Sequence, residues 1–349
     1  MGKFQMYENA VSIDKIPTKT LNNGMVMPAI GLGTFGSDHA DAELVSGVVR
    51  DALRLGYRYF DCAACYGNEA EIGKVFKEAF DGGLPREDIF VLSKLWNDKH
   101  DPKDAIEACK KTIADLQVGY LDVYMVHWPF PNYHAPFCDG DSRNPLSRPY
   151  IHEEFMELWH ALETLVDEGL VRALATSNVT IPKFEKILKD VRIKPVINQM
   201  EMHPCLQQGE LFQYCLDHDI QPVGFCPLGS PGRPERDKTA DDLVDMEMPE
   251  VVEIAKAHGV HPAEICLKWA YQRGQIPIPF TTKAKNALSN LKAVTEDPLT
   301  PLEMEKMRTV DRNCRLVKGQ VFLWPGADSW VDLWDVDGTI PGWNGYANK

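Results

Sequence analysis

Short apolar runs alternate with longer amphipathic stretches along most of this chain. In the longer stretches, apolar residues recur three and four positions apart, which is the spacing of an amphipathic helix. The first such stripe consists of Leu44, Val45, Val48, Val49, Ala52 and Leu53. It stops at Leu55-Gly56, and a glycine directly after the last apolar position is a typical helix end. The pattern therefore predicts helices and strands in regular alternation.

Eight of the short runs are expected to be strands, each followed by a helix. They are AIGLGTF (29–35), YRYFDCA (57–63), IFVLSKLW (89–96), LDVYMVHW (121–128), VRALATSN (171–178), PVINQMEMH (195–203), QPVGFCPLG (221–229) and QIPIPF (275–280). The last two helices are expected at 265–273 and 286–294. Alternation of this length indicates a parallel sheet, and eight repeats indicate an α/β fold closed into a (β/α)8 TIM barrel.

Both ends of the chain extend beyond the barrel. Asn23-Gly24 between apolar residues is a strong hairpin signal near the N-terminus. An α/β barrel commonly reaches this length as one domain. We therefore expect a single domain over 1–349, with a hairpin at about 18–28, the barrel at about 29–295, and a C-terminal helix and tail at about 300–349.

Three polar or irregular stretches interrupt the alternation. Two of them, 129–150 and 230–248, follow the fourth and seventh strands, so they belong to the face on which barrel enzymes carry their active sites. Plain surface insertions are an equal alternative. The third is the tail after Asp311, which carries Trp324, Trp330, Trp334 and Trp343. Because disordered segments are poor in aromatic residues, the tail is expected to pack over the barrel. The sequence leaves open whether the tail covers the active site.

Composition narrows the functional classes. Apolar residues make up 44% and charged residues 25% of the 349 residues, as in ordinary globular proteins. The net charge of −14 argues against nucleic acid or an anionic membrane as a partner. No apolar run approaches the ~20 residues that a membrane span needs, and residues 1–17 lack the apolar core of a secretion signal. Nine scattered cysteines in so large a chain are expected to be reduced thiols, as is typical of the cytosol. We therefore expect a cytoplasmic protein.

Cys62 and Cys65 have CxxC spacing, which leaves a thiol-redox site or half of a zinc site as an alternative. No second Cys/His pair of matching spacing follows them. Structural zinc sites need four ligands, so we expect no metal site.

Four polar residues lie at or just beyond the ends of three consecutive predicted strands. They are Asp61, Tyr66, Lys94 and His127. Side chains alternate between the two faces of a strand, so Lys94 shares a face with Leu92. A parallel barrel gathers successive strand ends at one face. The four side chains are therefore expected to form one site.

These residue types fit a proton-transfer site. A free tyrosine has a pKa of ~10, and a nearby ammonium lowers it by favouring phenolate. Lys94 is expected to lower the pKa of Tyr66 in this way, so that the phenol acts as a general acid. A buried lysine needs a charge partner, which Asp61 supplies. His127 is expected to donate a hydrogen bond to a substrate oxygen or to share the proton transfer.

The motifs around these residues resemble the aldo-keto reductase superfamily over nearly the whole chain. LNNGMVMPAIGLGTF is similar to its hairpin and first strand, and YRYFDCAACYGNE to the segment with its catalytic Asp and Tyr. SKLW and VHWP resemble the segments with its Lys and His. TSN, NQMEMHP and CPLGS resemble its nicotinamide-side segments.

The resemblance implies an NAD(P)H-dependent oxidoreductase without a metal that reduces an aldehyde or ketone to the alcohol, with Tyr66 as the general acid. The partner would be a small carbonyl compound, and the protein a monomer or weak oligomer. The coenzyme contacts implied are Thr34, Asp61, Ser177, Asn178, Gln199, Phe225, Cys226, Leu228, Ser230, Phe280, Thr281, Thr282, Asn286, Ser289 and Asn290. The substrate contacts implied are Phe35, Trp96, His127 and Trp128.

The chain departs from the family pattern at the coenzyme. Phe225 stands where the family usually has a stacking Tyr, and Cys226 where Ser is usual. Phe280 and Asn286 replace the Lys and Arg that hold the 2′-phosphate of NADPH. Arg and Lys are the natural phosphate partners, so we expect use of both coenzymes or a lean toward NADH. Lys283 and Lys285 lie nearby and are the alternative phosphate contacts.

The sequence does not identify the substrate. Aromatic residues with polar neighbours suit a sugar or another polyhydroxy carbonyl, and they suit an apolar aldehyde equally. The alternative function is a coenzyme-binding regulatory or structural subunit without turnover. The four polar residues argue against it, because a structural role does not need them.

Overall fold

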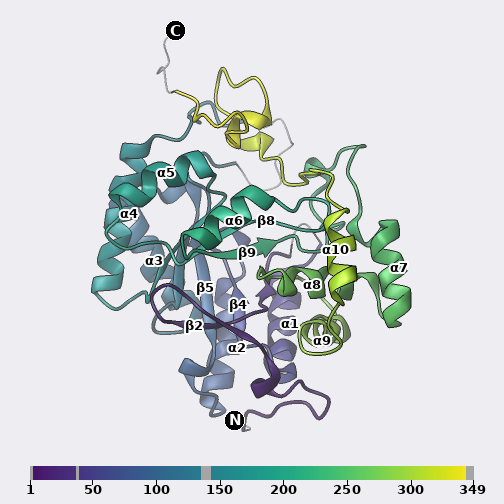
Figure 1. Ribbon diagram of the computed structural model, residues 1–349. Helices are drawn as coiled ribbons and strands as arrows, with labels where there is room; N and C mark the ends of the chain where they lie inside the picture. The colour runs from purple at the N-terminus through teal and green to yellow at the C-terminus, as the bar shows by residue number, and fades with distance from the viewer. Residues whose placement is uncertain (1–2, 37–38, 135–142, 343–349) are drawn as a thin grey trace.

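The computed structural model describes residues 3–36, 39–134 and 143–342. Its centre is an eight-stranded parallel sheet whose strands lie in the order of the chain (Figure 1). The strands are β3 (Leu32–Gly33), β4 (Tyr59–Asp61), β5 (Phe90–Leu95), β6 (Val123–Val126), β7 (Leu174–Ser177), β8 (Ile197–Glu201), β9 (Gln221–Phe225) and β10 (Ile276–Pro277). The Gly31 N–H donates to the Pro277 carbonyl (3.1 Å) and the Gly33 N–H to the Pro279 carbonyl (3.0 Å), which joins the two edges. The expected (β/α)8 barrel is confirmed.

Helices follow the strands as expected, with one addition. They are α1 (Ala42–Leu55), α2 (Glu69–Asp81), α3 (Pro102–Leu116), α4 (His152–Asp167), α5 (Ile181–Asp190), α6 (Gly209–Asp217), α7 (Pro249–His258), α8 (Pro262–Gln272), α9 (Ala284–Ala293) and α10 (Pro301–Arg308). α7 is the addition, so β9 is followed by two helices. α8 begins three residues before the predicted 265, because the His261 side chain caps it by accepting from the Ala263 N–H.

Local signals explain where these helices begin and end. In α1, the Asp41 side chain accepts a hydrogen bond from the Leu44 N–H and satisfies one of the free donors of the first turn. The helix ends at Gly56, which has a φ of 119°. A Cβ atom at Gly56 would lie 2.6 Å from the Val11 carbonyl oxygen. Glycine is therefore required here both by the backbone conformation and by the close neighbour.

The first and last strands are shorter than the sequence predicts. Each pairs over two residues instead of the six or seven expected at 29–35 and 275–280. Prolines at 277 and 279 lack an N–H and cannot continue the ladder. Gly31 brings the backbone against the Tyr59 ring, where an added Cβ would lie 2.3 Å from a ring carbon. These residues still close the barrel, but irregularly.

The core has two layers, which follow from the alternation of side chains along the strands. Leu92, Val123 and Met125 belong to the layer inside the barrel. Their strand neighbours Val91 and Tyr124 belong to the layer between the strands and the helices. Because Lys94 follows Leu92 by two positions and His127 follows Met125 by two, both continue inward-facing rows. The predicted shared face is thus confirmed.

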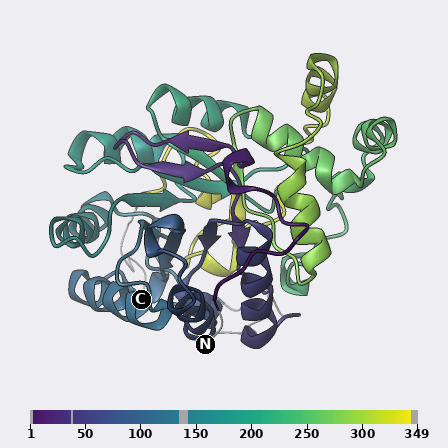
Figure 2. The ribbon, with the colours of Figure 1, turned by 90° about the horizontal axis from the view of Figure 1, so that it is seen from below.

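The hairpin closes one end of the barrel. Its strands are β1 (Thr18–Thr20) and β2 (Val26–Pro28), seen in dark purple from below in Figure 2. Met27 and Leu21 are buried in the inner layer. The Asn22 side chain donates to the carbonyls of Pro195 and Asp219, each at 3.0 Å. Strand ends cluster at the opposite end, which leaves that end for the site.

The tail lies at the opposite end of the molecule from the hairpin (yellow in Figure 1). It contains two short helices, η7 (Gln320–Phe322) and η8 (Trp330–Leu333). Phe322, Trp324 and Trp334 are buried in a cluster with Trp128 and Phe130. The expected packing of the tail is confirmed for these residues. Trp343 lies outside the described residues, as do residues 135–142 of the loop at 129–150.

The tail and the two long loops are joined by polar contacts. Asn132 in the first loop donates to the Phe322 carbonyl (2.7 Å) and the Arg148 carbonyl (2.7 Å). Lys318 in the tail donates to the Thr239 hydroxyl of the second loop (2.7 Å). Asp335 is fully buried and pairs with Lys183 of α5. All three segments therefore form one cover on the strand-end face.

Helix length and hydropathy in the part of the chain that the structure describes rule out a membrane-crossing helix there.

Candidate active site

Three polar side chains lie at the ends of the inward-facing rows of neighbouring strands, and a fourth lies on a short helix beside them. Asp61 is the last residue of β4, and Lys94 lies in β5. His127 directly follows β6, and Tyr66 is carried by the short helix η2 (Ala64–Tyr66). The strand register pairs Asp61 with Leu92 and Lys94 with Met125. The structure thus brings together the four residues that the sequence predicted.

Asp61 and Lys94 form a buried ion pair. Their exposed fractions are 2% and 0%, and the Lys94 Nζ atom contacts Oδ1 of Asp61. Nζ also donates to the Cys62 carbonyl at 2.9 Å. Oδ2 of Asp61 accepts from the Gln199 side chain at 2.6 Å and from the Tyr59 hydroxyl at 3.2 Å. Buried charges are stable only when paired and hydrogen-bonded in this way.

Tyr66 lies beside this pair at the mouth of the barrel. The Lys94 Nζ atom is 3.4 Å from the Tyr66 hydroxyl oxygen and 5.2 Å from the centre of its ring. Burial raises the pKa of the Tyr66 phenol well above its ordinary value, and the charge of Asp61 adds to the rise. In the protein alone the net pKa is therefore raised, with burial as the main cause, and the role of Lys94 in lowering it stays a prediction.

His127 faces Tyr66 across the mouth. The two rings lie edge to face with their centres 5.9 Å apart, and Trp96 packs against the other side of the imidazole at 5.2 Å. Burial lowers the pKa of His127 well below its ordinary value, and the charge of Lys94 adds to this effect. The imidazole is therefore neutral at physiological pH. A neutral imidazole offers one N–H for donation.

The predicted nicotinamide-side residues surround the quartet. The Asn178 side chain donates to the His127 carbonyl at 3.0 Å and to the Ser177 hydroxyl at 3.1 Å. Its Oδ1 atom is buried and has no hydrogen-bond partner within the described residues. An unpaired buried acceptor fits the amide N–H of a nicotinamide. Gln199 instead uses its N–H group on Asp61, and Ser177 donates to the Gln199 carbonyl.

The end of β9 offers an aromatic face beside these groups. Phe225 is half-buried, and the register pairs it with Glu201 of β8. Cys226 and Ser230 have φ values of 50° and 37°, which residues other than glycine rarely adopt. Together with Leu228 they form a tight turn that remains partly exposed. Thr34, which follows β3, is buried, and its hydroxyl donates to the Asp61 carbonyl at 2.8 Å.

The predicted adenosine-side residues lie at the end of β10 and on α9. Phe280, Thr281 and Thr282 are half-buried, Asn286 is exposed, and Asn290 is buried. The Ser289 hydroxyl donates to the Glu264 carboxylate at 2.8 Å. Ser289 thus contacts a negative group, whereas Lys283 and Lys285 are exposed on the same segment.

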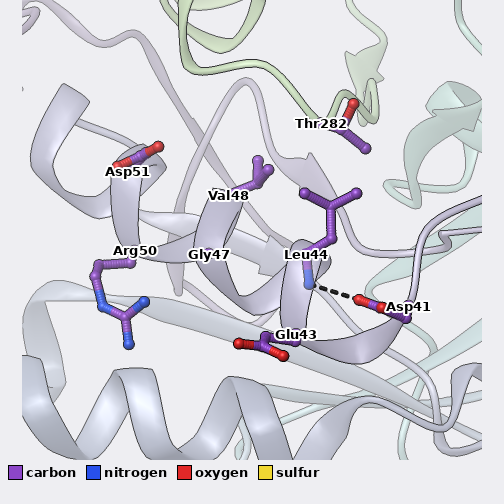
Figure 3. Close-up of a pocket in the computed structure, with 8 residues that line it drawn as sticks. All are labelled: Asp41, Glu43, Leu44, Gly47, Val48, Arg50, Asp51 and Thr282. Carbon is purple, nitrogen blue, oxygen red and sulfur yellow. Dashed lines mark hydrogen bonds between the residues drawn. The ribbon is translucent and has the colours of Figure 1, made fainter.

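Thr282 also borders a surface depression of about 590 Å³. The other lining residues come from α1 and its N-cap, among them Asp41, Glu43, Arg50 and Asp51 (Figure 3). None of the quartet lines it. Acidic side chains outnumber the single arginine, so the depression does not resemble a phosphate site.

Aromatic side chains border the quartet. Phe35 is 43% exposed, and its ring centre is 5.0 Å from that of Tyr66. Trp96 contacts His127 and also Phe322 of the tail, at 6.0 Å. Trp128, in contrast, is only 5% exposed and packs on Phe322 at 4.6 Å. The structure thus places Phe35 and His127 against Tyr66, Trp96 against His127, and Trp128 beneath the tail.

Three residues of the site were not predicted from the sequence. Tyr59 holds Asp61, and the signal was available, because it precedes Asp61 by two positions on the same strand face. Cys65 lies 3.6 Å from the His127 ring, and the short helix η2 that turns it there left no sequence pattern. Phe322 comes from the tail, where no periodic pattern indicates a neighbour.

The CxxC cysteines lie in different surroundings. Cys62 is fully buried in the outer core layer, whereas Cys65 is exposed at the mouth. Within the described residues, no group of three or more His, Cys, Asp or Glu side chains is placed to hold a metal ion.

A family model and several known proteins match most of this chain. The sequence model of the Aldo/keto reductase family matches residues 29–312. Aldo-keto reductase family 1 member A1 of Homo sapiens is 41% identical over 303 residues, which is 85% of this chain and 90% of that protein. The Bos taurus protein of the same name is 40% identical over the same shares. Aldo-keto reductase family 1 member A1-A of Danio rerio is 38% identical over 306 residues, 86% of this chain and 91% of that protein. The chain therefore belongs to the aldo/keto reductase family.

Proposed function

We propose that this protein reduces the carbonyl group of an aldehyde or ketone to an alcohol with a nicotinamide coenzyme. The observation that carries the proposal is the buried Asp61–Lys94 pair, which lies 3.4 Å from the Tyr66 hydroxyl and opposite a neutral His127. This is the proton-transfer half of a carbonyl reduction. The names of the relatives agree with it.

The coenzyme would supply the hydride to the carbonyl carbon. Tyr66 is the proton donor to the carbonyl oxygen, because its raised pKa keeps the phenol protonated at neutral pH. Once the proton leaves, the phenolate lies beside the Lys94 ammonium, which stabilises it. His127 donates a hydrogen bond to the same carbonyl oxygen. Asp61 holds Lys94 in place through their buried contact.

The nicotinamide is expected to lie against the ends of β7, β8 and β9. Asn178 would accept from its amide through the unpaired Oδ1, and Phe225 would present its ring face to the nicotinamide ring. Ser177 donates to the Gln199 carbonyl, and the Gln199 side chain donates to Asp61, which fixes the ends of β7 and β8. The chemistry of the donors present therefore fits the coenzyme.

We expect NADH to be used at least as well as NADPH. Phe280 and Asn286 stand where a phosphate would need cations, and Glu264 brings a carboxylate to Ser289. A phosphate beside a carboxylate is repelled, whereas a ribose hydroxyl is not. The test is saturation kinetics with both coenzymes. A wild-type preference for NADPH above about tenfold, ~1.4 kcal/mol, would contradict the proposal.

A double variant sharpens this test. Phe280→Lys with Asn286→Arg should raise kcat/KM for NADPH relative to NADH by at least about tenfold, because two charge-assisted contacts are added. Lys283→Ala with Lys285→Ala is the control for the two exposed lysines nearby. If the control lowers NADPH use and the double variant changes nothing, the lysines hold the phosphate instead.

The substrate is expected to be an aldehyde or ketone with an apolar or aromatic substituent. Phe35, Trp96 and Phe322 make the wall beside Tyr66 and His127 aromatic. A panel of aromatic, aliphatic and sugar aldehydes, followed through coenzyme oxidation, tests this. Lower KM for sugars than for aromatic aldehydes would favour the polyhydroxy alternative. Coenzyme binding without turnover of any carbonyl would favour the regulatory role.

A further inference from the structure

We propose that Cys65 is a positioning residue that fixes which nitrogen of His127 carries the proton. The Cys65 Sγ atom lies 3.6 Å from Nδ1 of His127. The proposal rests on the proposed function, since it concerns the same carbonyl-reducing site. It assigns a role to a side chain that is neither part of the catalytic quartet nor used as a redox pair.

The backbone brings Cys65 and Tyr66 to the imidazole together. Both belong to η2, whose turn is closed by a bond from the Tyr66 N–H to the Ala63 carbonyl at 3.1 Å. Successive side chains of a 3₁₀ turn point in different directions. The Tyr66 hydroxyl thus lies near Lys94, while the Cys65 Sγ atom lies near Nδ1 of His127.

Tyr66, Trp96 and Asn178 contact His127 but do not select a tautomer. Tyr66 and Trp96 contact it edge to face, and ring contacts of this kind do not distinguish the two nitrogens. Asn178 binds the backbone carbonyl of His127, not the ring. Among the described residues, the hydrogen bond to Cys65 distinguishes Nδ1 from Nε2. Which nitrogen of a neutral imidazole is protonated is set by the bond that the other makes.

The direction of this bond follows from the two groups. Desolvation raises the pKa of the Cys65 thiol to about 12, so the sulfur keeps its proton, although part of the side chain is exposed. A neutral imidazole nitrogen is a good acceptor, whereas thiol sulfur is a weak one. The thiol therefore donates to Nδ1, and the imidazole proton resides on Nε2. The Nε2–H group is then the donor for the carbonyl oxygen.

Two substitutions separate this role from simple packing. Cys65→Ser keeps a donor at the same place, and Cys65→Val keeps the volume but removes the donor. Loss of one neutral hydrogen bond of this kind is expected to lower kcat/KM for an aldehyde by about threefold to tenfold in Cys65→Val. Cys65→Ser should retain at least about half of the wild-type value, because a hydroxyl also donates to Nδ1.

The tautomer itself is read from two-bond ¹H–¹⁵N spectra of protein labelled in histidine, with the His127 signals identified by their loss in His127→Asn. Wild type and Cys65→Ser should show the Nε2–H form, and Cys65→Val a mixture. An Nδ1–H form in the wild type, or an unchanged tautomer in Cys65→Val, would overturn the proposal. Equal loss of activity in both variants without a tautomer change would show packing alone. If the wild type reduces no carbonyl, the proposed function fails while the spectra still report on Cys65.

Discussion

The Lys94 Nζ atom lies 3.4 Å from the Tyr66 hydroxyl oxygen, and the same Nζ atom is paired with Asp61. The lysine is thus shared between a permanent carboxylate and a phenol that becomes charged only after it gives up its proton. Before the reaction the phenol is protonated, as its raised pKa requires. The raised pKa thus keeps the proton on Tyr66 until the reaction, and the Lys94 ammonium stabilises the phenolate that proton donation leaves.

Removing the Tyr66 hydroxyl should abolish most turnover. In Tyr66→Phe the ring stays in place between Phe35 and His127, but the proton donor is lost, and a general acid contributes about 10²- to 10⁴-fold. We expect kcat to fall by at least about 100-fold, with coenzyme affinity unchanged within about twofold. Steady-state kinetics and coenzyme titration measure both.

Tyr124→Phe is the matched control for this variant. The Tyr124 hydroxyl is buried in the outer layer and has no hydrogen-bond partner within the described residues, so its removal should leave kcat unchanged. Normal carbonyl reduction by Tyr66→Phe would show that another group donates the proton.

The Asp61–Lys94 pair should behave as one unit in stability measurements. Removing one partner of a buried pair costs about 3–5 kcal/mol, because the other charge stays buried and unpaired. Asp61→Asn and Lys94→Met should each lower the free energy of unfolding by about this amount, and the double variant by clearly less than the sum. Urea unfolding of the four proteins measures the coupling.

An exposed pair provides the comparison. In α2, the Lys74 Nζ atom lies 2.6 Å from Oε1 of Glu71, and the side chains of Glu71 and Lys74 are 40% and 65% exposed. Such exposed pairs contribute about 0–1 kcal/mol to stability. Glu71→Gln should therefore change little. Full additivity in the Asp61/Lys94 cycle would mean that the buried pair is not coupled.

The sequence predicted the barrel and the quartet for the same physical reason. Strands alternate their side chains with a period of two, so Lys94 and His127 could be assigned to the inner face from Leu92 and Met125 alone. The rule that strand ends meet at one face then placed Asp61 and Tyr66 beside them. Both arguments use only local pattern and chain order.

The remaining features depend on contacts that have no local pattern. The pKa of Tyr66 is raised by burial and by the charge of Asp61, and both depend on the packed structure. The position of Trp128 depends on Phe322, nearly two hundred residues later in the chain. Gln199 was assigned to the coenzyme by its motif, but its side chain donates to Asp61 in the structure. Tertiary contacts of this kind are decided by packing, which residue type alone does not specify.

The tail should open when its buried ion pair is removed. Lys183 is 2% exposed and pairs with Asp335, which also accepts from the Thr180 hydroxyl. Asp335→Ala leaves the lysine buried without its charge partner, a change worth about 3–5 kcal/mol. We expect faster hydrogen exchange of residues 320–335 and a higher KM for aromatic aldehydes, because Phe322 leaves Trp96.

Asp337→Ala is the control within the same tail. Asp337 is exposed and bonds only to Thr339 among the described residues, so its loss should leave exchange and KM unchanged. Equal exchange in wild type and Asp335→Ala would show that the aromatic cluster holds the tail without the ion pair.

Stability should fall between about pH 6.5 and 9 because of His203. The His203 ring lies between Asp245 and Glu201, at 2.9 and 3.1 Å, and all three are buried. Burial opposes the charged form, but the hydrogen bonds to Asp245 and Glu201 outweigh it and raise the pKa of His203 to about 9. In the unfolded chain the pKa is ~6.5.

The sign follows from this difference. A raised pKa in the folded state means that the folded protein binds the proton more tightly, so the contribution is fully present below pH 6.5 and is lost as pH rises to about 9. The shift corresponds to a contribution on the order of 3 kcal/mol. The His203 ring links β8 to the loop at 230–248 through Asp245. Glu201 in turn accepts from the Leu316 and Val317 N–H groups of the tail.

His203→Gln isolates this contribution from other titrating groups, because glutamine keeps hydrogen bonds but not the charge. The difference in unfolding free energy between wild type and His203→Gln should shrink steadily from pH 6.5 to 9, as measured by urea unfolding at each pH. Groups such as His258, whose pKa is also raised by Asp297 and Glu303, titrate in both proteins and cancel in the difference. A difference that stays constant over this range would mean that His203 is not charged in the folded protein, and that neutral hydrogen bonds alone join the loop and the tail.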